Sequence, residues 1–562
     1  MRIGSIINGF AFPIGTRACV PRAAFAHILM SSRPSIEPPQ PDTPAAHTAP
    51  IVAPIAPVSS PLDTPPVAEI PVMAVMGGLM LAILLGALEQ TIVAVALPVI
   101  AGEFNGFALM AWLVSAYLVA STVVTPIYGK LSDLYGRRAM LTTAIILFVL
   151  ASVACALATS MPMLLFARVL QGLGGGGLIS VSQATIADVV PLRERGRYQG
   201  YVSGMWAMAS LAGPVIGGYL THYLSWRWIF WINLPLGIVA LLVVRRTLRH
   251  LPVAHQRRPI DVPGVVLFAV GLTALLLMIT RVGQGAPLAQ PENLGLLAGA
   301  VVLLGAFVWQ ENRAVEPIIP LSMFRVRTVT ICCLALFLCF FQLIATSVLM
   351  PLRFQMVAGA SPDAAALRLV PLTLSIPLGA FIAGKWMTHS GRYKPLMLIG
   401  ACVVPFAVAS LGLLDPHSVL PLTLAMIVLG LSIGVQFPTG LVATQNAVPP
   451  QTVGLATALT AFSRLLGGAV GVAVLTSVLI ALLRQAAPEA QVAAGGDVLM
   501  DLFHAALASS GADAQALQRA GESAFRHLFF FAAAVSVVSP LLIMRLEEKV
   551  LRGKVSLAEA IE

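Results

Sequence analysis

The chain has 562 residues, of which 58% are hydrophobic and only 10% are charged, and its net charge is +10. Soluble domains contain about 25% charged residues, so a soluble globule of this composition could not cover its surface. The composition therefore excludes an ordinary cytosolic enzyme. The basic residues lie in short clusters between long apolar segments, which is typical of membrane topology and argues against nucleic-acid binding. The sequence predicts an all-α, polytopic membrane protein.

The first 69 residues differ in composition from the rest of the chain. Eleven of the 33 residues in 34–66 are proline, and such a segment favours extended polyproline structure and builds no core. We expect 1–69 to be a disordered cytoplasmic tail, and residues 545–562 to form a second cytoplasmic tail. A translation start nearer Met30 or Met73 is an alternative that the sequence leaves open.

Fourteen apolar segments follow, many of them close to the ~20 residues that a membrane-spanning helix needs. The expected spans lie near residues 71–98, 110–129, 140–159, 162–184, 199–223, 228–246, 262–281, 294–312, 328–349, 366–387, 396–414, 419–441, 452–483 and 528–544.

The basic residues around these spans indicate an orientation. If the N-terminus is cytoplasmic, the inner loops and the C-terminal tail hold 21 Lys and Arg residues and the outer segments hold 7. Cytoplasmic loops carry the excess of Lys and Arg, so both termini are expected in the cytoplasm. We expect the protein in the cytoplasmic (inner) membrane of a bacterium.

The sequence contains no phosphate-binding P-loop and no convincing cluster of metal ligands. Five of its six cysteines lie in apolar segments, without the spacing of disulfides or metal sites. No polar segment is long enough for a catalytic domain, so an enzyme is not expected. The expected energy source is an ion gradient or the gradient of the substrate itself, with no metal and no cofactor.

The loop expected between the second and third spans reads Gly-Lys-Leu-Ser-Asp-Leu-Tyr-Gly-Arg-Arg. Gly129 and Gly136 allow a tight turn and close helix approach, and Asp133 can pair with a basic residue or cap a helix. A merely basic loop would need Arg137 and Arg138, but it would not need the glycines and the acid at this spacing.

This loop resembles the Gly-x-Leu-x-Asp-x-x-Gly-Arg-Lys/Arg motif of the major facilitator superfamily, where it acts as a cytoplasmic latch between helices during alternating access. A weaker copy at 384–394 has Thr388 at the acidic position, so the resemblance implies a second latch without its charge pair. Such a copy also fits two related halves.

The fourth span contains Arg168, followed by a run of glycines. An arginine inside a span is costly unless it faces a partner or a wet cavity; the alternative is an arginine that reaches the interface from near a helix end. The segment resembles the fourth-span motif of the family, and this resemblance implies a role for Arg168 in proton transfer.

The fifth span contains Gly213, Pro214, Gly217 and Gly218. By itself this pattern predicts only a kinked helix that packs closely against a neighbour. Its match to Gly-Pro-x-x-Gly-Gly resembles the antiporter motif of the superfamily, and this resemblance implies export rather than import.

The first span reads Leu-Glu-Gln-Thr-Ile-Val-Ala-Val-Ala-Leu-Pro, with Glu89 as its acid. It is similar to the signature of the fourteen-span drug:proton antiporter branch, which usually has Asp there. Burial and a nearby cation such as Arg168 act in opposite senses on a carboxyl group. We predict that Glu89 and Arg168 couple protons to transport, and a neutral, hydrogen-bonded structural acid is the alternative. Asp188 and Asp261 are expected to cap helices.

The candidate cavity residues are aromatic, amide or basic side chains within the spans, although such side chains often serve packing alone. The last six spans contain no central carboxylate. In some multidrug members of the family that this chain resembles, an acid there accompanies divalent cationic drugs, so the resemblance implies neutral, lipophilic or monovalent substrates. The candidates are Trp206, Phe341, Gln342, Gln436, Phe437 and Arg464.

The combined resemblance implies a major facilitator fold of six, two and six helices. Six-helix bundles are expected at 70–246 and 328–544, joined by a linker at 247–327 with two extra spans. The implied function is proton-coupled export of small lipophilic or drug-like molecules by alternating access.

Two other functions stay open: dedicated export of one endogenous metabolite or siderophore-like compound, and a non-transporting membrane sensor or scaffold. The expected partners are a small-molecule substrate, protons and the lipid bilayer, but not nucleic acid. A periplasmic adaptor protein is a further partner that the sequence leaves open.

Overall fold

The structure is a computed structural model that describes residues 72–104, 106, 109–250, 261–486 and 512–551. The tail predicted at 1–69 lies outside the described residues, as do residues 552–562 of the second tail. Every regular element in the described part is helical.

The apolar segments form long helices, because within a bilayer a helix satisfies every backbone N–H and C=O group in its own segment. Thirteen helical segments in the described part are long and apolar enough to cross a membrane. The remaining predicted span is α5, a 32-residue helix that packs against α1 and α11. The α-helices are α1 (Val72–Glu103), α2 (Met110–Tyr135), α3 (Arg137–Ala156), α4 (Met161–Val189), α5 (Leu192–Tyr223), α6 (Trp228–Trp231), α7 (Asn233–Thr247), α8 (Val262–Gly283), α9 (Pro291–Glu311), α10 (Arg327–Met356), α11 (Pro362–Ser390), α12 (Lys394–Leu413), α13 (Val419–Asn446), α14 (Val453–Ala486), α16 (Ala512–Ser536) and α17 (Val538–Met544), and the 3₁₀ helices are η3 (Leu248–His250), η4 (Leu321–Arg325) and η5 (Pro450–Thr452).

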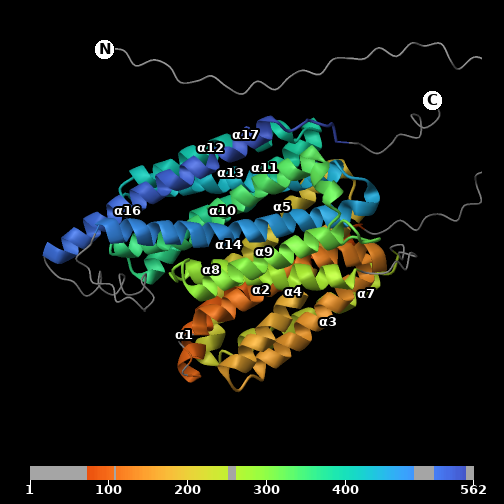
Figure 1. Ribbon diagram of the computed structural model, residues 1–562, viewed down its shortest axis with the longest axis horizontal. Helices are drawn as coiled ribbons and strands as arrows, with labels where there is room; N and C mark the ends of the chain where they lie inside the picture. The colour runs from red at the N-terminus through yellow and green to blue at the C-terminus, as the bar shows by residue number, and fades with distance from the viewer. Residues whose placement is uncertain (1–71, 105, 107–108, 251–260, 487–511, 552–562) are drawn as a thin grey trace, which may run out of the picture. The chain divides into compact units, whose positions relative to one another are not determined.

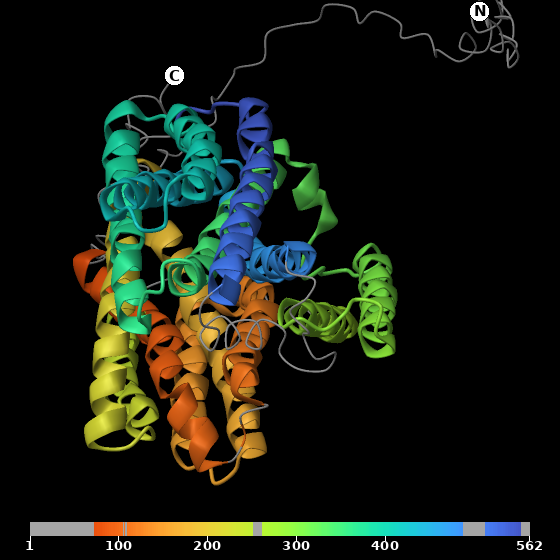
Figure 2. The same ribbon diagram turned by 90° about the vertical axis from the view of Figure 1, so that its left-hand side faces the viewer.

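The helices of each half of the chain lie together. In Figure 1, α1–α4 and α7 (orange to yellow) lie on one side and α10–α13, α16 and α17 (green to blue) on the other. Helix α4 is central, because 67% of its most apolar 18-residue stretch is buried inside the protein. For α9 the same share is 17%. The α8–α9 pair stands at the edge in Figure 2 (light green), where α8 packs on α2 and α14.

Helix α2 is longer than predicted and runs through the expected loop to Tyr135. It ends at Gly136, whose φ of 91° is a backbone conformation that favours glycine. Helix α3 begins directly afterwards at Arg137. Gly129 and Asp133 therefore lie on the last turns of a helix and not in a flexible loop, which fixes the direction of the Asp133 side chain.

Two predicted spans are each built from two helices. Helix α6 ends at Trp231 and α7 begins at Asn233, while α16 ends at Ser536 and α17 begins at Val538. Helix α16 starts well before the span predicted at 528–544, and residues 487–511, between α14 and α16, lie outside the described part. The described residues form one compact unit, and the boundaries of the two bundles remain predictions.

Candidate functional site

The centre of the site is the carboxylate of Glu89, which is fully buried on α1. Arg168 of α4 forms an ion pair with Oε1 of Glu89. Asn233, the first residue of α7, donates from Nδ2 to Oε2 at 2.5 Å. Both oxygens of the carboxylate therefore accept a hydrogen bond inside the protein. The structure brings the two predicted proton-coupling residues, Glu89 and Arg168, into direct contact.

Further polar side chains connect this pair to α3 and α2. The guanidinium of Arg168 donates to Gln171 Oε1 at 2.6 Å and, through Nε, to the carbonyl oxygen of Leu113 at 3.1 Å. Gln171 Nε2 donates to Ser152 Oγ at 2.7 Å. Gln171 and Ser152 are fully buried. The result is a closed polar network that joins five helices, α1, α2, α3, α4 and α7.

Aromatic rings cover the guanidinium of Arg168. The Tyr117 ring centroid lies 4.6 Å and the Phe230 centroid 5.9 Å from its Cζ atom. Removing one member of a buried ion pair leaves the other charge uncompensated, which typically costs several kcal/mol. Protonation of Glu89 would have this effect, because it would leave Arg168 without a counter-charge. Protonation of Glu89 would therefore weaken the electrostatic attraction that holds α1 against α4.

Asn233, Gln171 and Ser152 were not among the predicted site residues. Gln171 follows Arg168 by three residues, so both lie on one face of a helix, and Asn233 is an amide in an otherwise apolar segment. These signals are weak, because isolated amides and hydroxyls also occur in membrane helices for packing. Only the tertiary structure shows that they face Glu89.

The glycines of the predicted antiporter motif hold α5 against α1, beside Glu89. A Cβ atom on Gly213 would collide with Thr91, and a Cβ atom on Gly217 would lie 2.7 Å from the carbonyl oxygen of Ile92. Thr91 Oγ1 donates to the carbonyl oxygen of Ala209 at 2.9 Å. Gly218 is less tightly packed, since its nearest contact would be 3.8 Å away. At Gly213 and Gly217, α5 therefore packs directly on α1 with no space between the two backbones.

The latch segment (Gly129, Asp133, Gly136, Arg137 and Arg138) forms an ion-pair cluster at one end of the helices. Arg137 lies 2.5 Å from Asp133 and 2.7 Å from Asp188, and it also donates to Ser132 Oγ at 2.5 Å. Arg138 is exposed.

The predicted capping role of Asp188 is wrong. It lies at the C-terminal end of α4, where it accepts from Arg137, and the partial charge at this end of a helix is negative. Asp261 does cap a helix, since Oδ1 accepts from the backbone N–H of Gly264.

The latch segment also reaches the second half of the chain. Oδ2 of Asp133 accepts from the backbone N–H of Leu455 at 3.0 Å, in the first turn of α14. Free N–H groups and the helix dipole make such a turn favourable for a carboxylate. A Cβ atom on Gly129 would collide with Ala458, so α2 and α14 meet without space between them.

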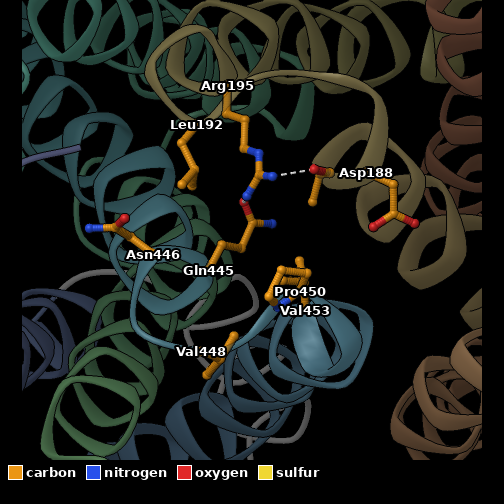
Figure 3. Close-up of a pocket in the computed structure, with 9 residues that line it drawn as sticks. Asp188, Leu192, Arg195, Gln445, Asn446, Val448, Pro450 and Val453 are labelled. Carbon is orange, nitrogen blue, oxygen red and sulfur yellow. Dashed lines mark hydrogen bonds between the residues drawn. The ribbon is translucent and has the colours of Figure 1, made fainter. Parts of the chain in front are cut away.

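A second contact joins α4 and α5 to α13 at the same end. Arg195 donates to the carbonyl oxygens of Ala187 and, at 2.9 Å, of Val190, and to Gln445 Oε1 at 3.1 Å. Ala187, Arg195 and Gln445 line a cavity of about 270 Å³ (Figure 3). Asp188 and Arg195 thus lie on one wall of the cavity and Gln445 on the other.

The weaker copy of the motif, in α11, lies where α5 and α11 cross. A Cβ atom on Gly384 would collide with the carbonyl oxygen of Gly196, so the two backbones touch. Thr388 Oγ1 donates to the carbonyl oxygen of Gly384. This crossing is a glycine contact, in contrast to the ion-pair cluster of the latch segment.

The predicted cavity residues do not form one cluster. Trp206 packs in the first half, in the hydrophobic clusters of α1, α5 and α7. The backbone of Phe341 touches Gly471 of α14, and Gln342 and Gln436 are buried on α10 and α13. Arg464 and Phe437 are in contact, with 4.2 Å between the guanidinium carbon and the ring centroid. Within the described residues, no group of three or more His, Cys, Asp or Glu side chains could hold a metal ion.

Comparisons with known proteins agree with this architecture. The family model described as Major Facilitator Superfamily matches residues 79–472. An uncharacterized MFS-type transporter of Mycobacterium tuberculosis is 36% identical over 433 residues, which make up 76% of this chain and 62% of that protein. This chain therefore matches less than two thirds of that relative's length. The multidrug transporter protein MdtP of Bacillus subtilis is 33% identical over 405 residues, 72% of this chain and 74% of that protein.

A solved structure shows the same fold. It is the proton:xylose symporter XylE bound to 6-bromo-6-deoxy-D-glucose, with a TM-score of 0.56 and 15% sequence identity, covering 85% of this chain and 97% of that one. The predicted fold class and family are confirmed by the family match over more than half of the chain and by these relatives. The chain belongs to the major facilitator superfamily.

Proposed function

We propose that the protein is a proton-coupled exporter of small lipophilic or drug-like molecules, located in the cytoplasmic membrane of a bacterium with both termini in the cytoplasm. Its similarity to a relative named as a multidrug transporter supports transport rather than catalysis. The observation that carries the proposal is the fully buried ion pair of Glu89 and Arg168. A buried ionisable pair within a membrane bundle is costly, and in membrane proteins such pairs mark ion and proton pathways.

The geometry suggests how protonation would drive the cycle. A proton that reaches Glu89 from the outside removes the charge that holds Arg168, so α1 is released from α4. Because α5 packs on α1 through Gly213 and Gly217, it follows. The beginning of α5 touches α11 at Gly196 and Gly384, so this movement would open the cytoplasmic contacts between the halves. Deprotonation towards the cytoplasm would restore the ion pair and close them.

The gradient supplies enough free energy for export without ATP. Each pH unit contributes about 1.4 kcal/mol, and each 100 mV contributes about 2.3 kcal/mol per charge moved. Inward movement of protons would be exchanged for outward movement of the substrate. No cofactor beyond the proton gradient enters this proposal.

The test is uptake of the uncharged lipophilic dye Nile red into inside-out vesicles that carry an imposed proton gradient. We expect uptake by the parent protein that stops with an uncoupler, and a loss of at least about tenfold in Glu89→Gln, because coupling requires the titratable group.

The matched control is Glu103→Gln, on the same helix. Glu103 is the last residue of α1. It pairs with Arg227 at 2.9 Å, and its side chain is 41% exposed. Uptake in this control should match the parent. Equal uptake by Glu89→Gln and the parent would contradict the role of Glu89. Absence of uptake in every variant, with the protein present, would favour a dedicated substrate or a non-transporting role.

A further inference from the structure

A second membrane-embedded arginine, Arg464, lies in a corner between two aromatic rings. It is on α14, and its guanidinium carbon lies 4.2 Å from the ring centroid of Phe437 on α13 and 5.1 Å from that of Phe340 on α10. The two rings are nearly perpendicular, with centroids 6.3 Å apart. Aromatic faces attract a guanidinium, but they accept none of its hydrogen bonds in the way that an oxygen does.

One hydrogen-bond donor of Arg464 is left unpaired within the described part of the chain. Its Nε atom is buried without a partner, and no carboxylate of the described residues forms an ion pair with it. Arg353 on α10 also has an unpaired Nε atom, but its two terminal nitrogens donate to the carbonyl oxygens of Leu411 and Leu414. Leaving a buried donor of a charged group unpaired is costly, so Arg464 is poised to receive an acceptor.

Two buried amides on the helices that carry these rings are also incompletely paired. Gln342 follows Phe340 by two residues on α10, and Gln436 directly precedes Phe437 on α13. Each side chain is 1% exposed. Both amide atoms of Gln342 and the Oε1 atom of Gln436 are buried without a partner among the described residues. Polar groups that are buried in a native protein are normally paired.

The charge of Arg464 is not balanced by the helices around it. The sequences of α10, α13 and α14 contain no Asp or Glu. Helix α14 also packs on α2, α4, α8 and α16, but Asp133, Asp188 and Glu522 on those helices form ion pairs with Arg137 or Arg526. In the first half, by contrast, the charge of Arg168 is balanced by Glu89. The second half therefore places a net positive charge in the membrane interior, and this charge attracts anions and repels cations.

We infer that Arg464, Phe340 and Phe437 bind the acidic group of an amphipathic organic anion, such as a carboxylate, sulfonate or phenolate attached to an aromatic or aliphatic body. A guanidinium donates two parallel hydrogen bonds to such a group, and the two rings provide apolar contact for the body next to it. The inference rests on the proposed function, because it names the class of molecule that would be exported. Lipophilic cations are predicted to be poor ligands.

The test compares two probes that differ in charge, 1-pyrenebutyrate and its uncharged amide, 1-pyrenebutyramide. Binding of each to the purified full-length protein is measured by fluorescence at pH 7.5. We expect the parent to bind the carboxylate about tenfold to a hundredfold more tightly than the amide, because the carboxylate gains charge-assisted hydrogen bonds. Arg464→Gln should bind both probes equally, and Arg464→Lys should retain part of the preference.

The control variant is Arg313→Gln, which removes an arginine that stacks on Trp309 at 3.9 Å beyond the end of α9. It should keep the preference of the parent. Binding of the amide by Arg464→Gln shows that this variant is folded, and Arg464→Lys provides an independent measure. Equal binding of both probes by the parent, or an unchanged preference in Arg464→Gln, would overturn the inference and leave Arg464 with a structural role.

This experiment separates the inference from the proposed function, because binding requires no proton gradient. A charge preference that depends on Arg464, without gradient-driven uptake of Nile red, would support the site and contradict proton-coupled export. Uncoupler-sensitive uptake of Nile red without a charge preference would contradict the site and support proton-coupled export.

Discussion

At the scale of single residues, the proposed function rests on how one buried carboxylate, Glu89, is compensated. Glu89 accepts from a cation on α4 and from an amide on α7. The cation holds the charged form, and the amide orients the carboxylate without adding charge. Asn233 belongs to the site as much as Arg168 does, because without it one carboxylate oxygen would be left unpaired in an apolar interior.

The first residue-scale prediction concerns Asn233→Leu, which keeps the volume of the side chain and removes the donor to Glu89. We expect a loss of stability of about 1–3 kcal/mol, because a buried acceptor is left unsatisfied, together with reduced uptake of Nile red. Thermal unfolding of the purified protein and vesicle uptake measure the two effects. Asn312→Leu, at the exposed end of α9, should change neither; a neutral result for both variants would show that Asn233 is dispensable.

At the scale of elements, glycines decide how closely helices approach the site. Helix α4 packs against α2 and α3 on two faces, where Cβ atoms on Gly172 and Gly174 would lie 2.5 Å from the Tyr117 carbonyl oxygen and 2.6 Å from the Phe148 backbone nitrogen. Such approach is possible only for the smallest residues. The glycine run after Arg168 therefore fixes the position of α4 and, with it, the position of the guanidinium.

The element-scale prediction uses two glycines of α5. A Cβ atom at Gly217 would press on the carbonyl oxygen of Ile92, whereas a Cβ atom at Gly204 would meet nothing within 4 Å. Gly217→Ala should therefore destabilise the protein by about 1–3 kcal/mol through overpacking. Gly204→Ala should be neutral or slightly stabilising, because alanine favours a helix. Thermal unfolding checks both, and equal effects at the two positions would rule out the α1–α5 contact as the cause.

At the scale of the whole molecule, the two halves meet at the end that carries the latch segment. The contacts are between α2 and α14, where Asp133 accepts from Leu455, and between α5 and α11, where Gly196 touches Gly384. In the proposed orientation this end is cytoplasmic, so the structure corresponds to a state closed on that side. Opening this end would require the loss of both contacts, and under the proposed function the ion pair on α1 would act on them through α5.

The whole-molecule prediction is that Gly384→Leu separates α5 from α11, because its side chain cannot fit against the backbone of Gly196. A cysteine replacing Ala461, which is 3% exposed on α14, reports the opening in a background without the native cysteines. Its labelling by a membrane-impermeant maleimide in inside-out vesicles should rise severalfold as the population shifts. Gly295→Leu, on the open face of α9, should leave labelling unchanged. Unchanged labelling in Gly384→Leu as well would mean that this crossing does not hold the halves together.

Much of the fold could be predicted from the sequence, because a span is a local property. Each expected segment corresponds to one helix or, at 228–246 and 528–544, to two consecutive helices. Other errors lie at the ends, as at α2, which continues to Tyr135. Helix ends depend on groups such as Gly136, whose backbone conformation only the folded chain shows. The break between α6 and α7 was missed for the same reason, since apolar composition continues across it.

The sequence by itself determined that this is a polytopic membrane protein of the major facilitator superfamily, and it pointed to Glu89 and Arg168, because composition and short motifs are carried by neighbouring residues. Only the tertiary structure decided which groups complete the site. Asn233 is 144 residues from Glu89 in the chain, and Leu455 is 322 residues from Asp133. Such pairs are set by the packing of helices distant in sequence, and no local pattern encodes them. The same packing leaves Arg464 among aromatic rings, with no carboxylate of the described residues beside it.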